Sequence, residues 1–441
     1  MKRNSILLAA LLLLSGGVLR AQDGPWSLSD CIAYALDHNL TVKQGELTVE
    51  QREVELSTAK GRRLPAFSAS ASENLSFGRG LTADNTYSNS NTTSTSFSLG
   101  GDLPIFQGFD ITNGIKLGKL NLAAATADLE KARDDIRVAV AQAYVQILYD
   151  QELLKVAAAQ VEHDAALLEQ VRERLAAGKV SEAEVSAQQA TLAQSRQSEI
   201  QARGNLQIAL LELTQLLELP SPEGFSIVTP EVGDPSQVLL MSPEAIFAEA
   251  VQIKPAVESA RIGVDYAKVG IDRAKGAFLP SLSLSGGLGT NYYTNSKMSS
   301  DSFGEQMRNN FSQYVGLNLS IPIFQRFSAR GQLRSAQINY EDRQIQLESV
   351  KKSLYKEIQQ AYYNAVGAQA RYSGSKEGEE SARVHYELTE EKFRLGKAGI
   401  ADYNDARNAW LKAASEHIQA RYQCLYQAKL LDFYRGEELK F

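Results

Sequence analysis

Few side chains in this sequence have the types and spacing that chemistry requires. Two cysteines, Cys31 and Cys424, cannot build a disulfide framework, and their positions do not show whether they meet. Asp402 and Asp405 are three residues apart and would share one face of a helix. The four histidines stand singly and match no metal-ligand motif: His38, His163, His385 and His417. We therefore expect no catalytic residue, no metal and no cofactor, and a protein that is not an enzyme.

The first 21 residues are typical of a secretory signal peptide. Lys2 and Arg3 precede an apolar run at residues 6–14, and small residues lead to Ala21. The mature chain is expected to begin near Gln22, where no cysteine offers a lipid anchor. No later segment has the roughly eighteen consecutive apolar residues of a membrane helix. The net charge of -6 makes nucleic acid an improbable partner.

The chain repeats itself in a constant order. AKGRRLP at residues 59–65 returns as AKGAFLP at 274–280, and LPIFQ at 103–107 returns as IPIFQ at 321–325. Later, QAY and then GK recur at nearly the same separation, in the same order. A long internal period of this kind indicates two copies of one structural unit.

Each copy contains a proline-free stretch that predicts a long helical hairpin. Residues 112–177 would form a helix about 99 Å long at 1.5 Å per residue. Apolar residues recur every seven positions in the first copy: Val140, Ile147, Leu154, Val161, Leu168, Leu175 and, after the turn, Val185, Leu192, Leu206 and Leu213. This period predicts left-handed coiled-coil packing, with turns near Gly178 and Gly396. An isolated two-helix coiled coil would have the same pattern.

Segments between the prolines alternate apolar and small polar residues, as strands do. They are residues 67–77, 96–105, 281–289 and 314–321, joined in pairs by polar loops at 78–93 and 294–310. Such alternation suits a sheet with lipid on one face and water on the other, although a soluble sandwich alternates as well. Because an open sheet edge is intolerable in lipid, we expect other chains to complete the sheet.

The order strand, strand, helical hairpin, repeated twice, resembles the TolC-like outer-membrane efflux proteins. The most specific matches are SIPIFQ at residues 320–325 and GKAGIADYNDA at residues 396–406. The resemblance implies an internally duplicated α+β membrane protein. In it, a trimeric twelve-stranded β-barrel with four strands per chain continues into a periplasmic α-helical coiled-coil barrel. The expected limits are a signal peptide (1–21), a first repeat (22–219), an equatorial linker (220–240), a second repeat (241–430) and a C-terminal equatorial segment (431–441).

The resemblance also implies a function and partners. It predicts a homotrimeric exit duct of a tripartite efflux or type I secretion system, in the outer membrane with its helices projecting into the periplasm. A periplasmic adaptor would open the duct, an inner-membrane pump would energise it, and outer-membrane lipid would surround the barrel. The adaptor would contact the tips of the two hairpins: Gly178, Lys179, Val180, Gly396, Lys397 and Ala398.

The resemblance places a gate beyond the second tip. Asp402 and Asp405 match the family's acidic lining of the periplasmic entrance, and Glu184 follows the first tip. Threefold symmetry would repeat these carboxylates as rings that repel one another and attract cations. Phe393 and Ala398 stand where the best-known members have a tyrosine and an arginine, so the family's closing bonds cannot be carried over.

Two other interpretations remain open. Acidic residues on a helix are most often solvated surface, and a glycine at a helix end often only makes a tight turn. The alternative function is a surface-exposed structural or adhesive coiled-coil protein. Such a protein has no need of duplicated strand and hairpin units, so the duplication favours the duct.

Overall fold

The computed structural model describes residues 24–81, 85–230 and 239–440; the predicted signal peptide and Phe441 lie outside them. The chain divides into two compact units. The helical unit comprises Met1–Gln44, Glu130–Lys254 and Lys352–Phe441. The sheet unit comprises Gly45–Leu129 and Pro255–Lys351. Each unit is described by itself.

The sheet unit holds four antiparallel strands in the order β1-β2-β3-β4. Their bounds are β1 (Ala66–Leu81), β2 (Tyr87–Gln107), β3 (Ser281–Asn295) and β4 (Ser312–Ser320). All four strands predicted from the alternating pattern are formed. Each strand pairs with its neighbours in sequence order, so β1 and β4 are the edges of this sheet.

The two faces of the sheet differ as the alternation predicts. Phe67 and Phe77 of β1 lie on one face, 75% and 73% exposed in the single chain. On the other face, Ser70 and Ser98 join their hydroxyls at 2.7 Å, as do Ser72 and Ser96 on the same pair of strands. One face is therefore apolar and the other small and polar.

Both segments predicted as loops contain regular secondary structure. Residues 78–93 are mostly strand, because β1 continues to Leu81, which pairs with Tyr87 at the start of β2. Here both faces are polar, so the apolar alternation that marks a strand ends before the hydrogen bonding does. The other loop contains a short helix, α8 (Phe303–Asn309), where the Ser302 and Glu305 side chains cap each other's backbone N–H groups.

Helices adjoin the strands of the sheet unit. They are α3 (Leu40–Gly61), α7 (Pro255–Gly276) and the first parts of α4 (Asp110–Ala176) and α9 (Ser328–Arg394). Asp110 accepts hydrogen bonds from Arg62 at 3.1 Å and from Arg273 at 2.6 Å, which ties three of these helix ends together. Gly108 has φ +55° and approaches Gly276 so closely that a Cβ would collide with its carbonyl oxygen. A side chain at residue 108 is thus excluded.

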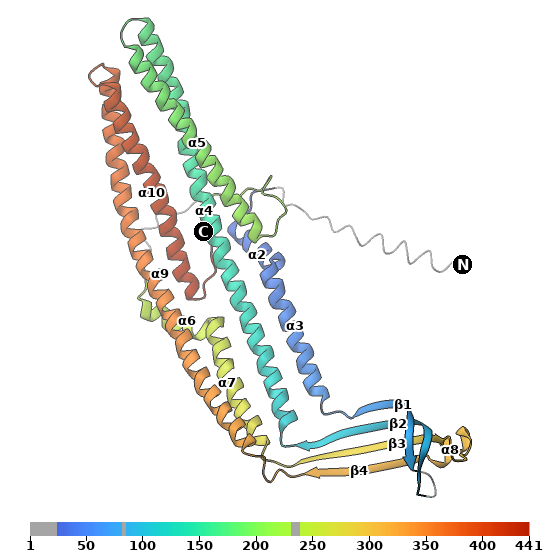
Figure 1. The fold of residues 1–441 in the computed structure, drawn as a ribbon. Coiled ribbons are helices and arrows are strands. Elements are labelled where there is room, and N and C mark those ends of the chain that lie inside the picture. The colour runs from blue at the N-terminus through green and yellow to red at the C-terminus, as the bar shows by residue number, and fades with distance from the viewer. Residues whose placement is uncertain (1–23, 82–84, 231–238, 441) are drawn as a thin grey trace, which may run out of the picture. The chain divides into compact units, whose positions relative to one another are not determined.

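The helical unit is built from two hairpins. In Figure 1, α5 (Glu182–Leu216) runs back along α4, and α10 (Ile400–Tyr434) runs back along α9. The described helices continue with α2 (Leu28–His38) and α6 (Pro243–Ile253). The element order helix, helix, strand, strand, hairpin occurs twice, with α8 added in the second copy. The predicted duplication is confirmed.

The heptad residues lie in the hairpin seams. Val140 and Ile147 are fully buried and Leu168 is nearly so, whereas Leu154 and Leu175 are half-buried. The seam of α9 is buried through small side chains, which allow close helix approach, at Ala361, Ala365 and Ala368. The seven-residue period of the first copy therefore identified the packed face of α4.

Residues 220–230 and 239–240, the described part of the expected equatorial linker, form no helix and none of the four strands of the sheet. Trp26 pairs with Ile227 in a parallel bridge, and the Tyr144 hydroxyl donates to the Val228 carbonyl at 2.6 Å. The last helix runs on to Tyr434, past the expected limit at residue 430. The domain limits themselves stay a prediction. None of the described helices is both long and apolar enough to cross a membrane.

Both cysteines are buried, and neither forms a disulfide bond. Burial, with a smaller contribution from the charge of Asp30, raises the pKa of Cys31 to about 12. The thiol of Cys31 is therefore protonated at physiological pH and acts as a small apolar side chain.

Candidate functional site

The two hairpin tips have the same backbone geometry. Gly178 has φ +70° and Gly396 has φ +71°. After the first glycine, the Lys179 amide donates to the Arg174 carbonyl at 2.9 Å, and after the second the Lys397 amide donates to the Lys392 carbonyl at 2.8 Å. Both tips thus end a helix with a glycine in the left-handed region, which closes the last turn.

The predicted tip residues are mostly on the surface. Gly178, Lys179, Gly396 and Lys397 are exposed, and Ala398 is half-buried. The sixth, Val180, instead packs on an apolar cluster formed by Leu167, Val171, Tyr386 and Tyr403. Five of the six are therefore available to a partner to some degree, while Val180 helps to hold the tip region together.

The gate carboxylates begin the returning helices. Glu184 accepts from the Ser181 amide at 3.3 Å, and Asp402 accepts from the Gly399 amide at 3.2 Å. Each acid thus occupies the third position of its helix and caps the first turn, where a negative charge also suits the helix dipole. Equivalent positions in the two copies have equivalent local roles.

Asp402 and Asp405 are both exposed, one turn apart on α10. Within the described residues, no hydrogen bond or ion pair joins any two of the carboxylates of Asp402, Asp405 and Glu184, and Asp405 makes neither kind of contact. An isolated chain therefore does not assemble the predicted ring. Each chain has three carboxylates near its tips, of which Asp402 and Asp405 are exposed and Glu184 is half-buried, and such charges can attract cations when copies are brought together.

A buried ion pair lies deeper in the same region. Asp164 of α4 is fully buried and accepts from the Arg407 guanidinium of α10, which is 2% exposed. The Ser195 hydroxyl of α5 and the Gln160 amide also donate to Asp164, the latter at 2.7 Å. One carboxylate thus connects both helices of the first hairpin to the returning helix of the second.

Aromatic side chains continue this connection toward the tips. The Tyr403 hydroxyl bonds to His163 and lies 3.1 Å from the Tyr386 hydroxyl. Phe393 stacks on Tyr403 with ring centroids 5.0 Å apart. The Arg174 guanidinium lies over the Phe393 ring, 5.0 Å from its centroid. Burial, then the hydrogen bond with Tyr386, raises the pKa of Tyr403. Tyr403 is therefore a neutral hydroxyl at physiological pH.

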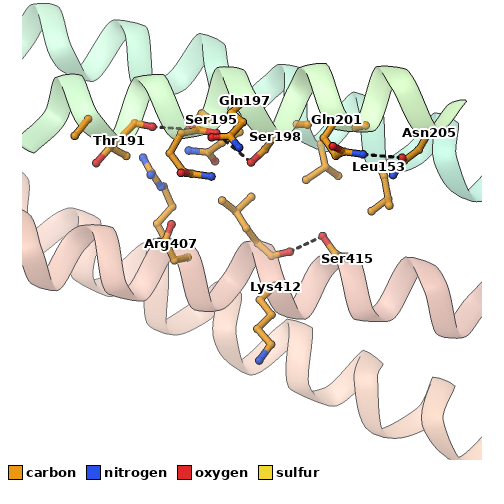
Figure 2. A pocket seen from close by; sticks show the side chains of 18 residues that line it. Leu153, Thr191, Ser195, Gln197, Ser198, Gln201, Asn205, Arg407, Lys412 and Ser415 are labelled. Atoms are coloured by element: carbon orange, nitrogen blue, oxygen red, sulfur yellow. Dashed lines mark hydrogen bonds between the residues drawn. The ribbon is translucent and has the colours of Figure 1, made fainter. Parts of the chain in front are cut away.

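Beyond Arg407 the two hairpins are separated by a groove. Its cavity of about 770 Å³ is lined by α4, α5 and α10, with uncharged polar residues such as Gln194, Gln201 and Asn205 along α5. Figure 2 shows Arg407 reaching from α10 toward Thr191 and Ser195 at one end of this groove. The ion pair of Asp164 with Arg407 therefore joins the hairpins where the groove ends.

Sequence reasoning missed this connection, although a signal for it existed. Asp164 follows Val161 by three residues, which is the second core position of the heptad, and a charge there is costly unless paired. Asp150 stands two heptads earlier at the same position, is also buried, and accepts from Gln146 at 3.0 Å. Charged residues on an apolar seam thus pointed to a buried polar contact but not to its partner.

Comparison with known proteins agrees with this geometry. The profile of the outer membrane efflux protein family matches residues 31–218 and 247–437. Outer membrane protein TolC of Escherichia coli K12 is 27% identical over 362 residues, covering 78% of this chain and 71% of TolC. Protein CyaE of Bordetella pertussis is 25% identical over 421 residues, covering 92% and 81% respectively.

Solved structures show the same fold. A crystal structure of CusC, described in connection with transmembrane channel formation, superimposes with a TM-score of 0.77 at 18% identity. The match covers 93% of this chain and 92% of CusC. Since the family profile spans most of both repeats, the chain belongs to the outer membrane efflux protein family.

Proposed function

We propose that the chain acts as the outer-membrane exit duct of a tripartite efflux or type I secretion system, working as a homotrimer with an adaptor and a pump. Family membership puts the sheet in the outer membrane and the helices in the periplasm. The observation that carries the proposal is the duplicated unit of two strands and a hairpin built on a 67-residue helix in each copy.

The open sheet edges support assembly with further copies of the chain. β1 and β4 each have an unpaired side, and unpaired backbone groups are not tolerated in lipid. Three copies, pairing β4 of one with β1 of the next, would close a barrel of twelve strands. The apolar face with Phe67 and Phe77 would then contact lipid, and the serine face would line the lumen.

Adaptor binding is assigned to the tips. Both turns expose a glycine and a lysine, Gly178 with Lys179 and Gly396 with Lys397. A Cβ placed on Gly178 or Gly396 would meet no atom within 4 Å, so open space surrounds both turns. Two equivalent turns per chain would offer six equivalent contacts to an adaptor ring.

Cation control is assigned to the acidic cluster beyond the tips. Asp402 and Asp405 from three chains would converge near Glu184, and their mutual repulsion would favour bound cations. Phe393 and Ala398 occupy the positions of the family's tyrosine and arginine, and their side chains cannot make the family's closing bonds. The bonds of Asp164 with Arg407 and of His163 with Tyr403 are therefore the candidates for holding the hairpins in the closed state.

Single-channel recording in a planar bilayer tests the gate assignment. Asp402→Ala with Asp405→Ala is expected to reduce cation selectivity and to weaken block by a trivalent cation added on the periplasmic side. The matched control removes two exposed carboxylates further from the tips, Glu377→Ala with Glu416→Ala, and should leave both properties as in the parent. Equal behaviour of the two double variants would mean that the gate carboxylates are ordinary surface charge.

A further inference from the structure

Four joints between strand and helix gather at one end of the sheet. The register pairs Ala66 with Asp102, Gln107 with Ser281, and Ser281 with Ser320, so all four strands meet their helices at the same end of the sheet. All four joints belong to the sheet unit. With the sheet in the outer membrane, this end lies at the boundary between lipid and periplasm.

The joints are basic in a chain whose net charge is -6. Most of their acidic side chains are neutralised, because Asp110 pairs with Arg62 and Arg273, and Asp272 pairs with Lys275 at 3.1 Å. Asp102 of β2 is exposed and is the one carboxylate near the joints, among the described residues, that has no ion pair. The remaining basic residues are exposed and have no carboxylate partner among the described residues: Lys60, Arg63, Arg326 and Arg330. The boundary therefore carries a surplus of unpaired positive charge.

The joint between β4 and α9, in the second copy, also exposes apolar side chains beside its basic residues. Ile323 is 95% exposed, and Phe324 and Phe327 are 69% and 65% exposed. A cavity of about 180 Å³ lies between them and Arg330, whose guanidinium is 5.7 Å from the centroid of Phe327. Aromatic rings beside basic side chains are typical of segments at a membrane interface.

Backbone strain marks the same joint. Arg326 and Phe327 have φ 52° and 63°, in the left-handed region that side chains with a Cβ disfavour. The corresponding residues of the first copy are Gly108 and Phe109, with nearly the same φ values of 55° and 64°. The second copy thus keeps the turn but replaces its glycine with a charged residue, at a cost in free energy. Strain kept at a charged, exposed position suggests that the guanidinium is used.

We propose that this joint is a binding site for the phosphate of an anionic phospholipid in the leaflet that faces the periplasm. Arg326 and Arg330 would hold the headgroup phosphate through charge-assisted hydrogen bonds. The glycerol and upper acyl chain would lie on Ile323, Phe324 and Phe327. This inference rests on the membrane placement of the sheet and is independent of the adaptor, the pump and the acidic gate.

Native mass spectrometry of the detergent-solubilised protein tests the site, with phosphatidylglycerol and phosphatidylcholine of equal chain length as probes. The parent is expected to prefer phosphatidylglycerol about tenfold, as expected for one or two basic contacts. Arg326→Gln with Arg330→Gln should bring the two affinities to within about twofold. The control pair on α9, Arg343→Gln with Lys352→Gln, changes the net charge equally and should keep the preference.

A single variant separates binding from folding. Arg326→Gly removes the strain and the guanidinium together, so its melting temperature should equal or exceed the parent's while the preference for phosphatidylglycerol falls. Binding of inorganic phosphate by the parent, with no binding of either lipid, would identify free phosphate as the ligand and would overturn a lipid site. A preference unchanged in the double variant, or lowered equally by the control pair, would also overturn it. Loss of oligomer mass in the double variant would show instead that the joint contacts a second copy.

Discussion

At the residue scale, the junction between the two hairpins combines a buried ion pair with buried polar atoms that lack hydrogen-bond partners. Asp164 and Arg407 form a buried ion pair, yet the Arg407 Nε and both polar atoms of the Gln188 side chain have no hydrogen-bond partner among the described residues. Buried polar groups without partners cost free energy, about 1–3 kcal/mol each. The junction is therefore held at a few points and is not optimised for stability, which would suit the opening of the proposed duct.

Removal of one member of the ion pair should be far more harmful than removal of both. Arg407→Leu leaves the Asp164 carboxylate buried without its counter-charge and should destabilise the helical unit by about 3–5 kcal/mol. Asp164→Leu with Arg407→Leu leaves no charge behind and should recover most of that loss. Thermal unfolding followed by circular dichroism measures both effects.

Channel recording distinguishes a closing role from a purely structural one. If the pair holds the hairpins together, the stable double variant should still open more often than the parent. A matched control is Asp135→Leu, which removes an exposed ion pair with Lys131 on α4, in the same unit. Double and single variants of equal stability would show that Asp164 does not depend on Arg407.

At the element scale, the hairpins were predictable and parts of the sheet were not. Absence of proline and a seven-residue period identify a packed helix whatever surrounds it, and α4 ends at Ala176, one residue before the predicted end. β2 was predicted short because its outer half is polar on both faces, and α8 was missed because its seven residues are too few to show a period.

The candidate site divides in the same way. The tip glycines could be predicted because a glycine after a long helical period predicts a left-handed turn. The gate role proposed for Asp402 and Asp405 came only from the family resemblance, since exposed acids on a helix are otherwise uninformative. The contact of Asp164 with Arg407 joins residues 243 positions apart, and no local pattern specifies such a pair.

Substitution at the tips tests whether the turns themselves are the docking element. Gly178→Leu with Gly396→Leu should abolish export in cells while the oligomer still assembles, because each change costs only about 1–2 kcal/mol of local backbone strain. Asparagine tolerates the left-handed region, so Gly178→Asn with Gly396→Asn is the matched control and should retain export. Normal export by the leucine variant would remove the tips from the mechanism.

At the scale of the whole molecule, a single chain leaves apolar surface on helices that stand in water. Ile200 and Ile208 of α5 are 71% and 58% exposed, and Ile338 and Ile345 of α9 are 51% and 71% exposed. Exposed apolar residues on regularly spaced turns of long helices mark surfaces that a partner covers. Further copies of the chain would both pair the open strand edges and cover these apolar helix faces.

Assembly as a trimer is the last prediction and can be weighed directly. Light scattering of the particle extracted in mild detergent should give three times the mass of the mature chain. Ile345→Glu would bury an unpaired carboxylate in each interface and should shift the particle toward single chains, since such burial costs about 2–7 kcal/mol. Ile345→Val keeps the apolar contact and should remain trimeric. If the glutamate variant stays trimeric, α9 does not face a neighbouring copy at residue 345. If the parent particle does not have the mass of three chains, a barrel of twelve strands is ruled out.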